Sequence, residues 1–281
     1  MDWYAGKKVL LVGGSEGIGR ATAVELARRG ADVMIAARRP GPLAETLALM
    51  TAAAASPSQR LAVLPLDVTD RASVKSAVDP VLGTLAGLDV LILAVGAARP
   101  GYVDELADEA YDAMLAVNYL GHVHVARAFL PHLLAQGRGD VCFLSSMLGF
   151  AAMPGWSAYS ASKYAIAGFA EALALELAPR GVRVTVFYPG TTDTPGLALE
   201  NREKPAAVWA MESGSAFNKI RKPEEVARSL LGGVERGRLN NFPGIDVWFV
   251  WFVTRRFPAL SRWLASREWA AARAKTTAKG V

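Results

Sequence analysis

Two hydrophobic periodicities alternate along the first 190 residues of the chain. Short apolar runs rich in β-branched residues predict buried parallel strands, at Val9–Val12, Val33–Ala36, Leu61–Leu64, Val90–Ala94, Val141–Leu144 and Val182–Tyr188. Longer stretches with helical spacing lie between them, at Gly17–Arg29, Pro42–Ala55, Arg71–Leu85, Tyr111–Gln136 and Ser157–Pro179. Six such alternations predict an α/β fold, in which a doubly wound parallel sheet lies between two layers of helices.

The pattern changes after the sixth predicted strand. Segment 189–222 is polar, contains several prolines and glycines, and predicts a long irregular loop. Its position places it at the carboxyl ends of the strands, where doubly wound proteins bind ligands. A further helix is predicted to begin near Pro223, with proline and acidic residues in its first turn. We therefore predict one domain over residues 1–240, including a substrate loop at 189–222, and a C-terminal extension over 241–281.

Composition limits the class of protein. The chain has 281 residues, of which 52% are hydrophobic and 20% charged, which excludes a disordered or fibrous protein. Cys142 is the only cysteine, so the chain forms no internal disulfide. The three histidines lack the spacing with cysteines or carboxylates that a zinc site needs, and no metal is expected.

Charge is concentrated in the C-terminal extension. The net charge is +5, and seven basic residues against one acidic residue lie between Thr254 and Val281. Residues 1–253 therefore carry 24 basic and 25 acidic side chains, close to neutrality. A nucleic-acid-binding domain would carry its basic surface on the folded body, so we expect no nucleic-acid partner.

The extension is also rich in tryptophan. Four of the seven tryptophans in the chain alternate there with arginines; they are Trp248, Trp251, Trp263 and Trp269. This pattern predicts an interfacial helix on an anionic membrane. The alternative is an aromatic segment that packs on a partner subunit or covers the substrate pocket. The N-terminus is not typical of a signal peptide. The longest apolar run of the extension, Val247–Val253, is too short to span a bilayer. We therefore expect a cytoplasmic protein in peripheral contact with the cytoplasmic membrane face.

A glycine-rich turn follows the first predicted strand. Glycines at Gly13, Gly17 and Gly19 allow a tight turn and close approach of the backbone to a pyrophosphate, with Ser15 and Ile18 in the same loop. The N-terminus of the next helix offers free N–H groups to an anion. The motif therefore predicts a dinucleotide site, although a glycine-rich turn without a ligand is the alternative.

The end of the second predicted strand indicates which dinucleotide binds. An acidic residue that would bind the ribose of NADH is missing, and Arg38 and Arg39 stand there instead. Guanidinium groups suit a 2′-phosphate, so NADPH/NADP+ is the expected cofactor, and two solvated arginines without a ligand are the alternative. Glu16 opposes this assignment, since its carboxylate would repel the phosphate.

A tyrosine and a lysine share one face of a predicted helix. Tyr159 and Lys163 are four residues apart, so the ammonium can lie near the phenol. The glycine motif and this pair occur in one order with three further features: Asn118, Ser146 and Pro189-Gly190. In this combination, residues 7–240 resemble the short-chain dehydrogenase/reductase family. The resemblance implies a Rossmann-type three-layer αβα fold with about seven strands.

The resemblance also implies a role for each of four residues. Tyr159 would be the general acid that protonates a carbonyl oxygen, and Ser146 would polarise that carbonyl. Lys163 would hold the nicotinamide ribose and lower the pKa of Tyr159. Asn118 would hold the water through which Lys163 is reprotonated.

Further cofactor contacts are implied in the same way. Asp67 and Val68 match the position that contacts adenine, although an acid at a helix N-terminus is the alternative for Asp67. Thr192 and Thr194 match the segment that contacts nicotinamide and phosphate. The remaining implied cofactor residues are Gly96, Pro189 and Gly190. The chain departs from the family pattern at Val12, where threonine is usual, and at Leu93–Val95, where an Asn-Asn-Ala sequence is usual.

The segment after Pro189 indicates a substrate. It contains Asp-Thr-Pro-Gly at 193–196 and Glu-Asn-Arg-Glu-Lys-Pro at 200–205, and resembles the substrate loop of family members that act on sphingoid bases. This implies NADPH-dependent reduction of the 3-keto group of 3-ketodihydrosphingosine, a long-chain lipid ketone, to dihydrosphingosine. The resemblance to the family as a whole implies a homodimer or homotetramer. Two alternatives remain: reduction of another apolar carbonyl, such as a 3-oxoacyl thioester or a steroid, and a non-catalytic nucleotide-binding scaffold on the same fold.

Overall fold

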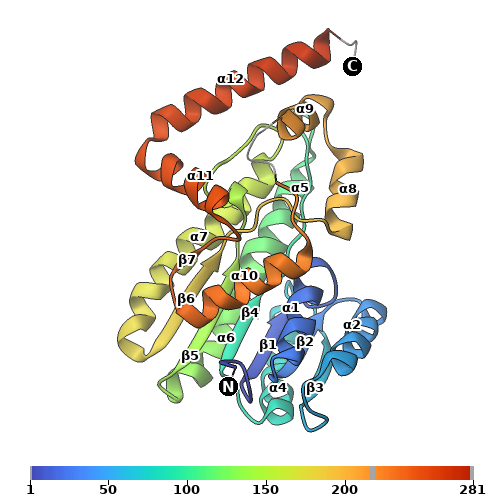
Figure 1. The fold of residues 1–281 in the computed structure, drawn as a ribbon, viewed down its shortest axis with the longest axis vertical. Coiled ribbons are helices and arrows are strands. Elements are labelled where there is room, and N and C mark those ends of the chain that lie inside the picture. Colours follow the sequence, from blue (N-terminus) through green and yellow to red (C-terminus); the bar gives the residue numbers. More distant parts are fainter. Residues whose placement is uncertain (1, 215–218, 279–281) are drawn as a thin grey trace.

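The fold is built on one parallel sheet, as the hydrophobic pattern predicts (Figure 1). The computed structural model describes residues 2–214 and 219–278. The seven strands have the order β3-β2-β1-β4-β5-β6-β7 across the sheet. They are β1 (Lys8–Val12), β2 (Asp32–Ala37), β3 (Leu61–Pro65), β4 (Val90–Leu93), β5 (Gly139–Leu144), β6 (Val182–Phe187) and β7 (Asn240–Asn241). The predicted doubly wound sheet is confirmed.

Helices cover both faces of the sheet. Val9 and Leu11 of β1 belong to the core under α1 (Gly17–Arg28), α2 (Pro40–Ala53) and α10 (Pro223–Arg236). Leu10 and Val12 alternate to the opposite core, which is covered by α3 (Arg71–Ser76), α4 (Val78–Leu85), α6 (Gly121–Ala135) and α7 (Ser157–Leu177). Burial on both faces explains why the strands are continuous apolar runs in the sequence.

The sheet order creates a crevice beside β1. Strand β1 pairs with β2 on one side and with β4 on the other, so the chain reverses its direction of winding there. The loops after the two strands diverge at their carboxyl ends, which is where ligands bind in this class of fold. The glycine loop after β1, Asp67 after β3 and Gly96 after β4 all lie at this edge of the sheet.

One predicted helix is interrupted by a wider turn. In place of a continuous helix over Tyr111–Gln136, the chain forms α5 (Asp108–Met114), a π-helical segment (Leu115–Leu120) and α6. Asn118 lies within the π-helical segment and is buried. Such turns are rare and are found most often at functional sites.

The predicted loop at 189–222 is wrong in part, because it contains two helices. These are α8 (Pro195–Glu203) and α9 (Ala206–Gly214); residues 215–218 of the loop lie outside the described residues. Thr194 caps α8 by accepting a hydrogen bond from the Leu197 N–H at 3.2 Å, and Pro195 occupies the first turn. The prolines that suggest a loop by composition therefore mark helix starts.

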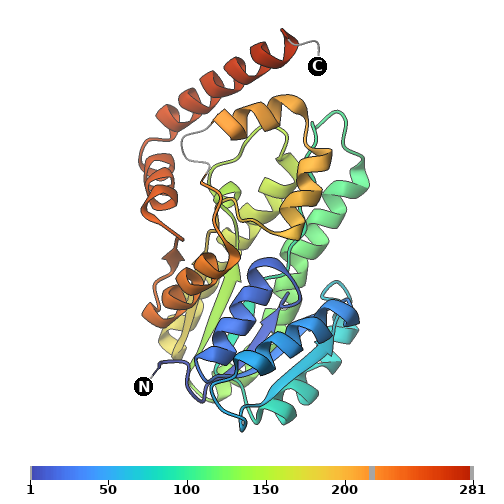
Figure 2. The same cartoon turned by 45° about the vertical axis from the view of Figure 1, so that its right-hand side comes forward.

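The C-terminal extension forms α11 (Ile245–Arg256) and α12 (Pro258–Thr277). Figures 1 and 2 both show α12 at the end of the molecule beyond the strands, beside α9, against which it packs. The half-exposed Asp246 on α11 binds the buried Arg221 guanidinium at 2.5 Å, and the Arg221 backbone bonds to Thr191 and Asp193. The extension is thus tied to the loop after β6. No helix in the described part of the chain is both long enough and apolar enough to cross a bilayer.

We expect Gly19→Ala to destabilise the domain. A Cβ at Gly19 would lie 1.9 Å from the carbonyl oxygen of Gly13, so the strand-to-helix turn would have to open. Overpacking of this kind costs about 1–3 kcal/mol of unfolding free energy. Gly41→Ala is the matched control, because nothing lies within 4 Å of a Cβ there. Urea unfolding measures both, and equal midpoints for the two variants would contradict the geometry.

Candidate active site

Two cavities meet at the carboxyl edge of the sheet. One, of about 520 Å³, is called the cofactor cavity here, and most of the predicted cofactor residues line it: Gly13, Ser15, Gly17, Ile18, Gly19, Arg38, Arg39, Asp67, Val68, Gly96, Tyr159, Lys163, Pro189 and Thr194. The other, of about 200 Å³, is called the catalytic cavity and is lined by Ser146, Tyr159, Gly190 and Thr192 among others. Tyr159 faces both, so the predicted catalytic and cofactor residues converge on one region.

The glycine loop is shaped for close approach. Gly13 has φ +94°, and a Cβ there would lie 2.6 Å from the backbone of Ala94 and Val95. Gly17, at φ +52°, begins α1, and the first three residues of that helix line the cofactor cavity, where free N–H groups can bind an anion. Glycine is needed at both positions for conformation and for space.

The two arginines after β2 have different partners. Arg39 forms an ion pair with Glu16 of the glycine loop. Arg38 is exposed at the rim of the cofactor cavity, near Asp67. Hydrogen bonds from Thr69 hold the pKa of Asp67 below its ordinary value, and the Arg38 charge lowers it further. The negative charge of Glu16 is therefore compensated mainly by Arg39.

Tyr159 lies on the first turn of α7, and Ser146 follows β5. The Tyr159 ring packs against Trp156, with 5.7 Å between ring centroids. Burial raises the pKa of Tyr159, the charge of Glu200 raises it further, and hydrogen bonding with Ser146 lowers it. The predominant direction is opposite to the lowering expected from Lys163. The phenol therefore holds its proton at neutral pH, which suits an acid.

Lys163 lies one turn farther along α7 and is buried. Its ammonium lies 5.7 Å from the centroid of the Tyr159 ring and donates a hydrogen bond to the Leu144 carbonyl at 3.1 Å. Burial lowers the pKa of Lys163 to about 8, so the side chain remains mostly protonated at neutral pH.

Asn118 stands behind Lys163 and holds the loop after β4. Its Oδ1 accepts from the Ala97 N–H at 2.8 Å, and its Nδ2 donates to the Ala97 carbonyl and to Ser162 Oγ, both at 2.9 Å. Gly96 lies next to this clamp, with a notional Cβ 3.3 Å from Lys163 Nζ. The side-chain amide thus positions the wall of the cofactor cavity, and the water-holding role of Asn118 stays a prediction.

Comparison with known proteins agrees with this geometry. A family model described as short chain dehydrogenase matches residues 7–205. The chain belongs to the short-chain dehydrogenase/reductase family. It is 34% identical over 242 residues to the 3-ketodihydrosphingosine reductase of Mus musculus, covering 86% of this chain and 72% of the relative. It is 33% identical, with the same coverage, to the 3-dehydrosphinganine reductase of Danio rerio, and 36% identical over 270 residues (93% and 80%) to a Drosophila melanogaster dehydrogenase/reductase SDR family protein 7-like.

As a short-chain dehydrogenase/reductase, the protein is an oxidoreductase that interconverts a carbonyl and an alcohol with a nicotinamide cofactor. The residues present fit that cofactor. Gly13 and Gly17 line the cofactor cavity at the N-terminus of α1, which is where a pyrophosphate binds in strand–turn–helix sites. Among the described residues, Lys163 Nζ donates to Leu144 alone, which leaves two donors for ribose hydroxyls on a group that lines the cofactor cavity.

Three charged side chains in the catalytic cavity of this reductase were not predicted from the sequence. Glu200 on α8, Lys204 after it and Glu212 on α9 all line the cavity. The pattern over residues 200–205 was visible in the sequence as a likeness to a substrate loop. The side chains could not be placed together, because α8 and α9 were predicted as a loop.

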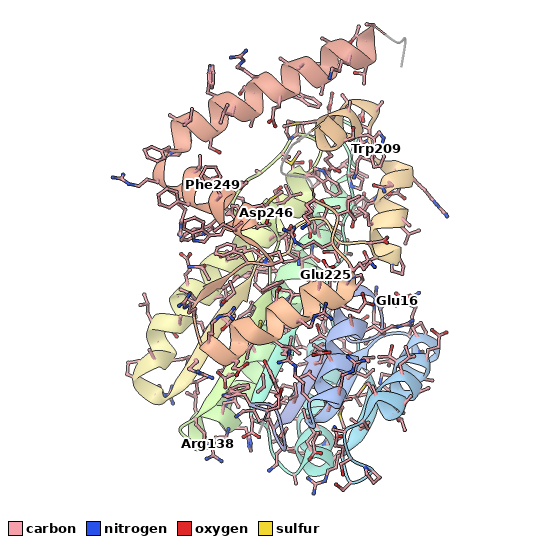
Figure 3. The ribbon with its side chains drawn as sticks, in the orientation of Figure 1. Glu16, Arg138, Trp209, Glu225, Asp246 and Phe249 are labelled. Atoms are coloured by element: carbon pink, nitrogen blue, oxygen red, sulfur yellow. The ribbon has the colours of Figure 1, made fainter. Side chains whose placement is uncertain are left out.

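A third, larger cavity adjoins the catalytic one. It measures about 810 Å³, has mainly apolar walls, and lies between α7, α11 and α12. We call it the apolar cavity; Met147 and Met153 line both it and the catalytic cavity. The ion pair between Arg255 of α11 and Glu171 of α7, at 2.9 Å, lies at its polar rim. Figure 3 shows Phe249, one of its lining residues, on α11, and Trp209 on α9, which packs against α12.

We expect Tyr159→Phe to remove most of the activity. Loss of the phenolic proton should lower the rate of carbonyl-dependent nicotinamide oxidation about 10²- to 10⁴-fold, the contribution typical of a positioned general acid. Cofactor affinity, measured by nicotinamide fluorescence, should change little. Tyr111→Phe is the control, since its hydroxyl forms an exposed hydrogen bond with Ser157 at 3.0 Å and lines neither cavity of the site. Full activity of Tyr159→Phe would exclude Tyr159 as the acid.

Proposed function

We propose that this reductase converts 3-ketodihydrosphingosine to dihydrosphingosine with NADPH. The observation that carries the proposal is the apolar cavity of about 810 Å³ that adjoins the catalytic cavity at Met147 and Met153. Its volume lies in the upper part of the range of about 300–1,000 Å³ found for ligand pockets. A ketone held between Ser146 and Tyr159 could extend a long alkyl chain into it. The names of the mouse and zebrafish relatives support the same substrate.

The reaction assigns one task to each group of the site. Nicotinamide supplies the hydride when it is bound. Ser146 Oγ donates a hydrogen bond to the carbonyl oxygen and stabilises the negative charge that develops on it. Tyr159 then donates its phenolic proton to that oxygen. Lys163 stabilises the resulting phenolate with its buried positive charge and holds the ribose.

Arg38 supports the choice of NADPH. Its guanidinium is exposed at the rim of the cofactor cavity, next to Asp67 and Val68, where the adenosine end of a dinucleotide lies in this fold. The ion pair between Arg39 and Glu16 partly neutralises the one carboxylate of the glycine loop. The 2′-phosphate of NADPH would lie beside the positive charge of Arg38, whereas NADH has no phosphate for that guanidinium to bind.

The C-terminal extension supports peripheral binding to the cytoplasmic face of a membrane. An exposed group of rings crosses from α11 to α12: Trp248 stacks on Phe252 at 5.6 Å, and Phe252 contacts Phe257 at 6.4 Å. We call these three residues the aromatic patch. Each has 39–49% of its surface exposed, and Arg255 and Arg256 lie nearby in the sequence. Aromatic rings beside basic residues are typical of interfacial helices. A homodimer or homotetramer stays a prediction of the family resemblance.

The substrate and cofactor are tested together by following NADPH oxidation. We expect turnover of 3-ketodihydrosphingosine in mixed micelles, with kcat/KM at least tenfold lower for NADH than for NADPH. Arg38→Ala should reduce this cofactor preference about tenfold or more, as loss of a charge-assisted contact would. Turnover of a 3-oxoacyl thioester or a steroid ketone alone would refute the proposed substrate while leaving the chemistry intact.

Membrane binding is tested by cosedimentation with vesicles. We expect the protein to bind vesicles rich in phosphatidylserine more tightly than phosphatidylcholine vesicles. The double variant Phe252→Ser/Phe257→Ser should lower the partition coefficient at least tenfold, because it removes two exposed rings that lie outside the apolar cavity. Val103→Ser/Leu175→Ser, which removes two exposed apolar side chains elsewhere, is the control. Equal partitioning of both double variants would rule out the aromatic patch as the contact.

A further inference from the structure

One carboxylate in the catalytic cavity has no partner in the part of the chain that the structure describes. Glu200 is half-buried on α8 and lines both the catalytic and the cofactor cavity. Within residues 2–214 and 219–278, its oxygens accept no hydrogen bond and form no ion pair. Buried carboxylates are ordinarily paired, because burial without a partner is costly. The position is therefore suited to a ligand that brings a positive charge.

The nearby charges are already committed to one another. Lys204 Nζ, almost fully buried, lies 2.5 Å from Glu212 Oε2 and 3.0 Å from Asn201 Oδ1. It also lies 5.3 Å from the ring centroid of Trp156, whose Nε1 donates to the other Glu212 oxygen at 2.8 Å. Lys204 and Glu212 thus neutralise each other, and the charge of Glu200 is left over.

The pKa of Glu200 reflects this situation. Burial raises it to about 7; Lys204 lowers it, and the repulsion of Glu212 raises it. At neutral pH the carboxyl is close to the midpoint of its titration. A bound cation would favour the ionised form, as a neighbouring opposite charge does.

Glu200 also acts on the reacting group. Its charge raises the pKa of Tyr159, so the two side chains interact across the catalytic cavity. In a 3-keto sphingoid base the amino group is on the carbon next to the carbonyl. The ammonium is thus only a few bonds away from the carbonyl oxygen. When that oxygen accepts a hydrogen bond from Tyr159, the ammonium also lies close to the Tyr159 hydroxyl.

We propose that Glu200 is a specificity-determining residue that binds the ammonium group of the amino ketone. The assignment rests on the proposed function, and it concerns what separates this substrate from ketones and thioesters of equal chain length that carry no amine. Glu200, Lys204, Glu212 and the substrate ammonium then form a set of two anions and two cations.

The same contact favours the chemical step. Proton donation converts Tyr159 to a phenolate, which a free Glu200 carboxylate opposes by repulsion. A substrate ammonium between them cancels that repulsion, whereas a neutral ketone leaves the two anions facing one another. We therefore expect the amino ketone and a neutral ketone to differ in kcat as well as in KM.

The test compares two substrates in two variants. The substrates are 3-ketodihydrosphingosine and its deamino analogue, which has the same chain, hydroxyl and ketone. We expect the wild-type enzyme to prefer the amino ketone about 10- to 100-fold in kcat/KM, the range for a hydrogen bond between charged groups. Glu200→Gln should abolish this preference, through loss with the amino ketone and an unchanged or faster rate with the deamino ketone.

Glu203→Gln is the matched control. Glu203 is on the same helix, three residues away, and is exposed in an ion pair with Arg99 at 3.6 Å. Removing this surface charge should leave the preference as in the wild type. The affinity of each variant for NADPH, measured by fluorescence, separates substrate recognition from an effect on the cofactor cavity.

The outcomes distinguish this inference from the proposed function. Retention of the amine preference in Glu200→Gln would overturn the role of Glu200 and leave the proposed substrate standing. Equal loss of activity toward both ketones would also overturn it, since that indicates a structural or cofactor effect. Wild-type turnover of the deamino ketone without turnover of the amino ketone would overturn the proposed substrate and the assignment of Glu200 together.

Discussion

The parallel arrangement of the strands determines where everything else in this molecule lies. Because all seven strands point the same way, every loop that follows a strand emerges at one edge of the sheet. The glycine loop after β1, the arginines after β2, Asp67 after β3 and Ser146 after β5 therefore become neighbours although more than 130 residues separate the first from the last. Burial of the sheet on both faces holds the strands in place, and the strands in turn fix the points from which these loops start.

Behind that edge, the site is held by hydrogen bonds that leave little freedom. Asn118 uses both atoms of its amide to hold Ala97 and Ser162, and the π-helical turn around it sets the direction of the side chain. Lys163 is oriented by the Leu144 carbonyl, at the end of the strand that precedes Ser146. The acid and the ammonium both belong to α7, four residues apart, so their separation does not depend on any flexible connection.

The sequence was sufficient for the sheet and the common catalytic residues, and insufficient for the substrate side. Strands such as Val90–Leu93 are predictable because burial on both faces leaves only apolar residues. The glycine turn and the Tyr159–Lys163 pair are local in sequence and so keep their spacing in the fold. By contrast, α8 depends on the Thr194 cap and α9 on packing against α12, which local composition does not reveal. The burial of Lys204 and the isolation of Glu200 follow from that packing, so they could not be predicted one residue at a time.

The apolar cavity has a consequence for how such a protein can diverge. Much of its wall comes from α11 and α12, the last segments of the chain, whereas Ser146, Tyr159 and Lys163 are attached to the central sheet and α7. The Arg221–Asp246 and Arg255–Glu171 ion pairs join the two parts, together with the buried Val247. Replacement of the C-terminal extension would therefore reshape the apolar cavity while leaving the reacting groups in place. The extension is thus a part of the chain through which the same chemistry can be directed to new compounds.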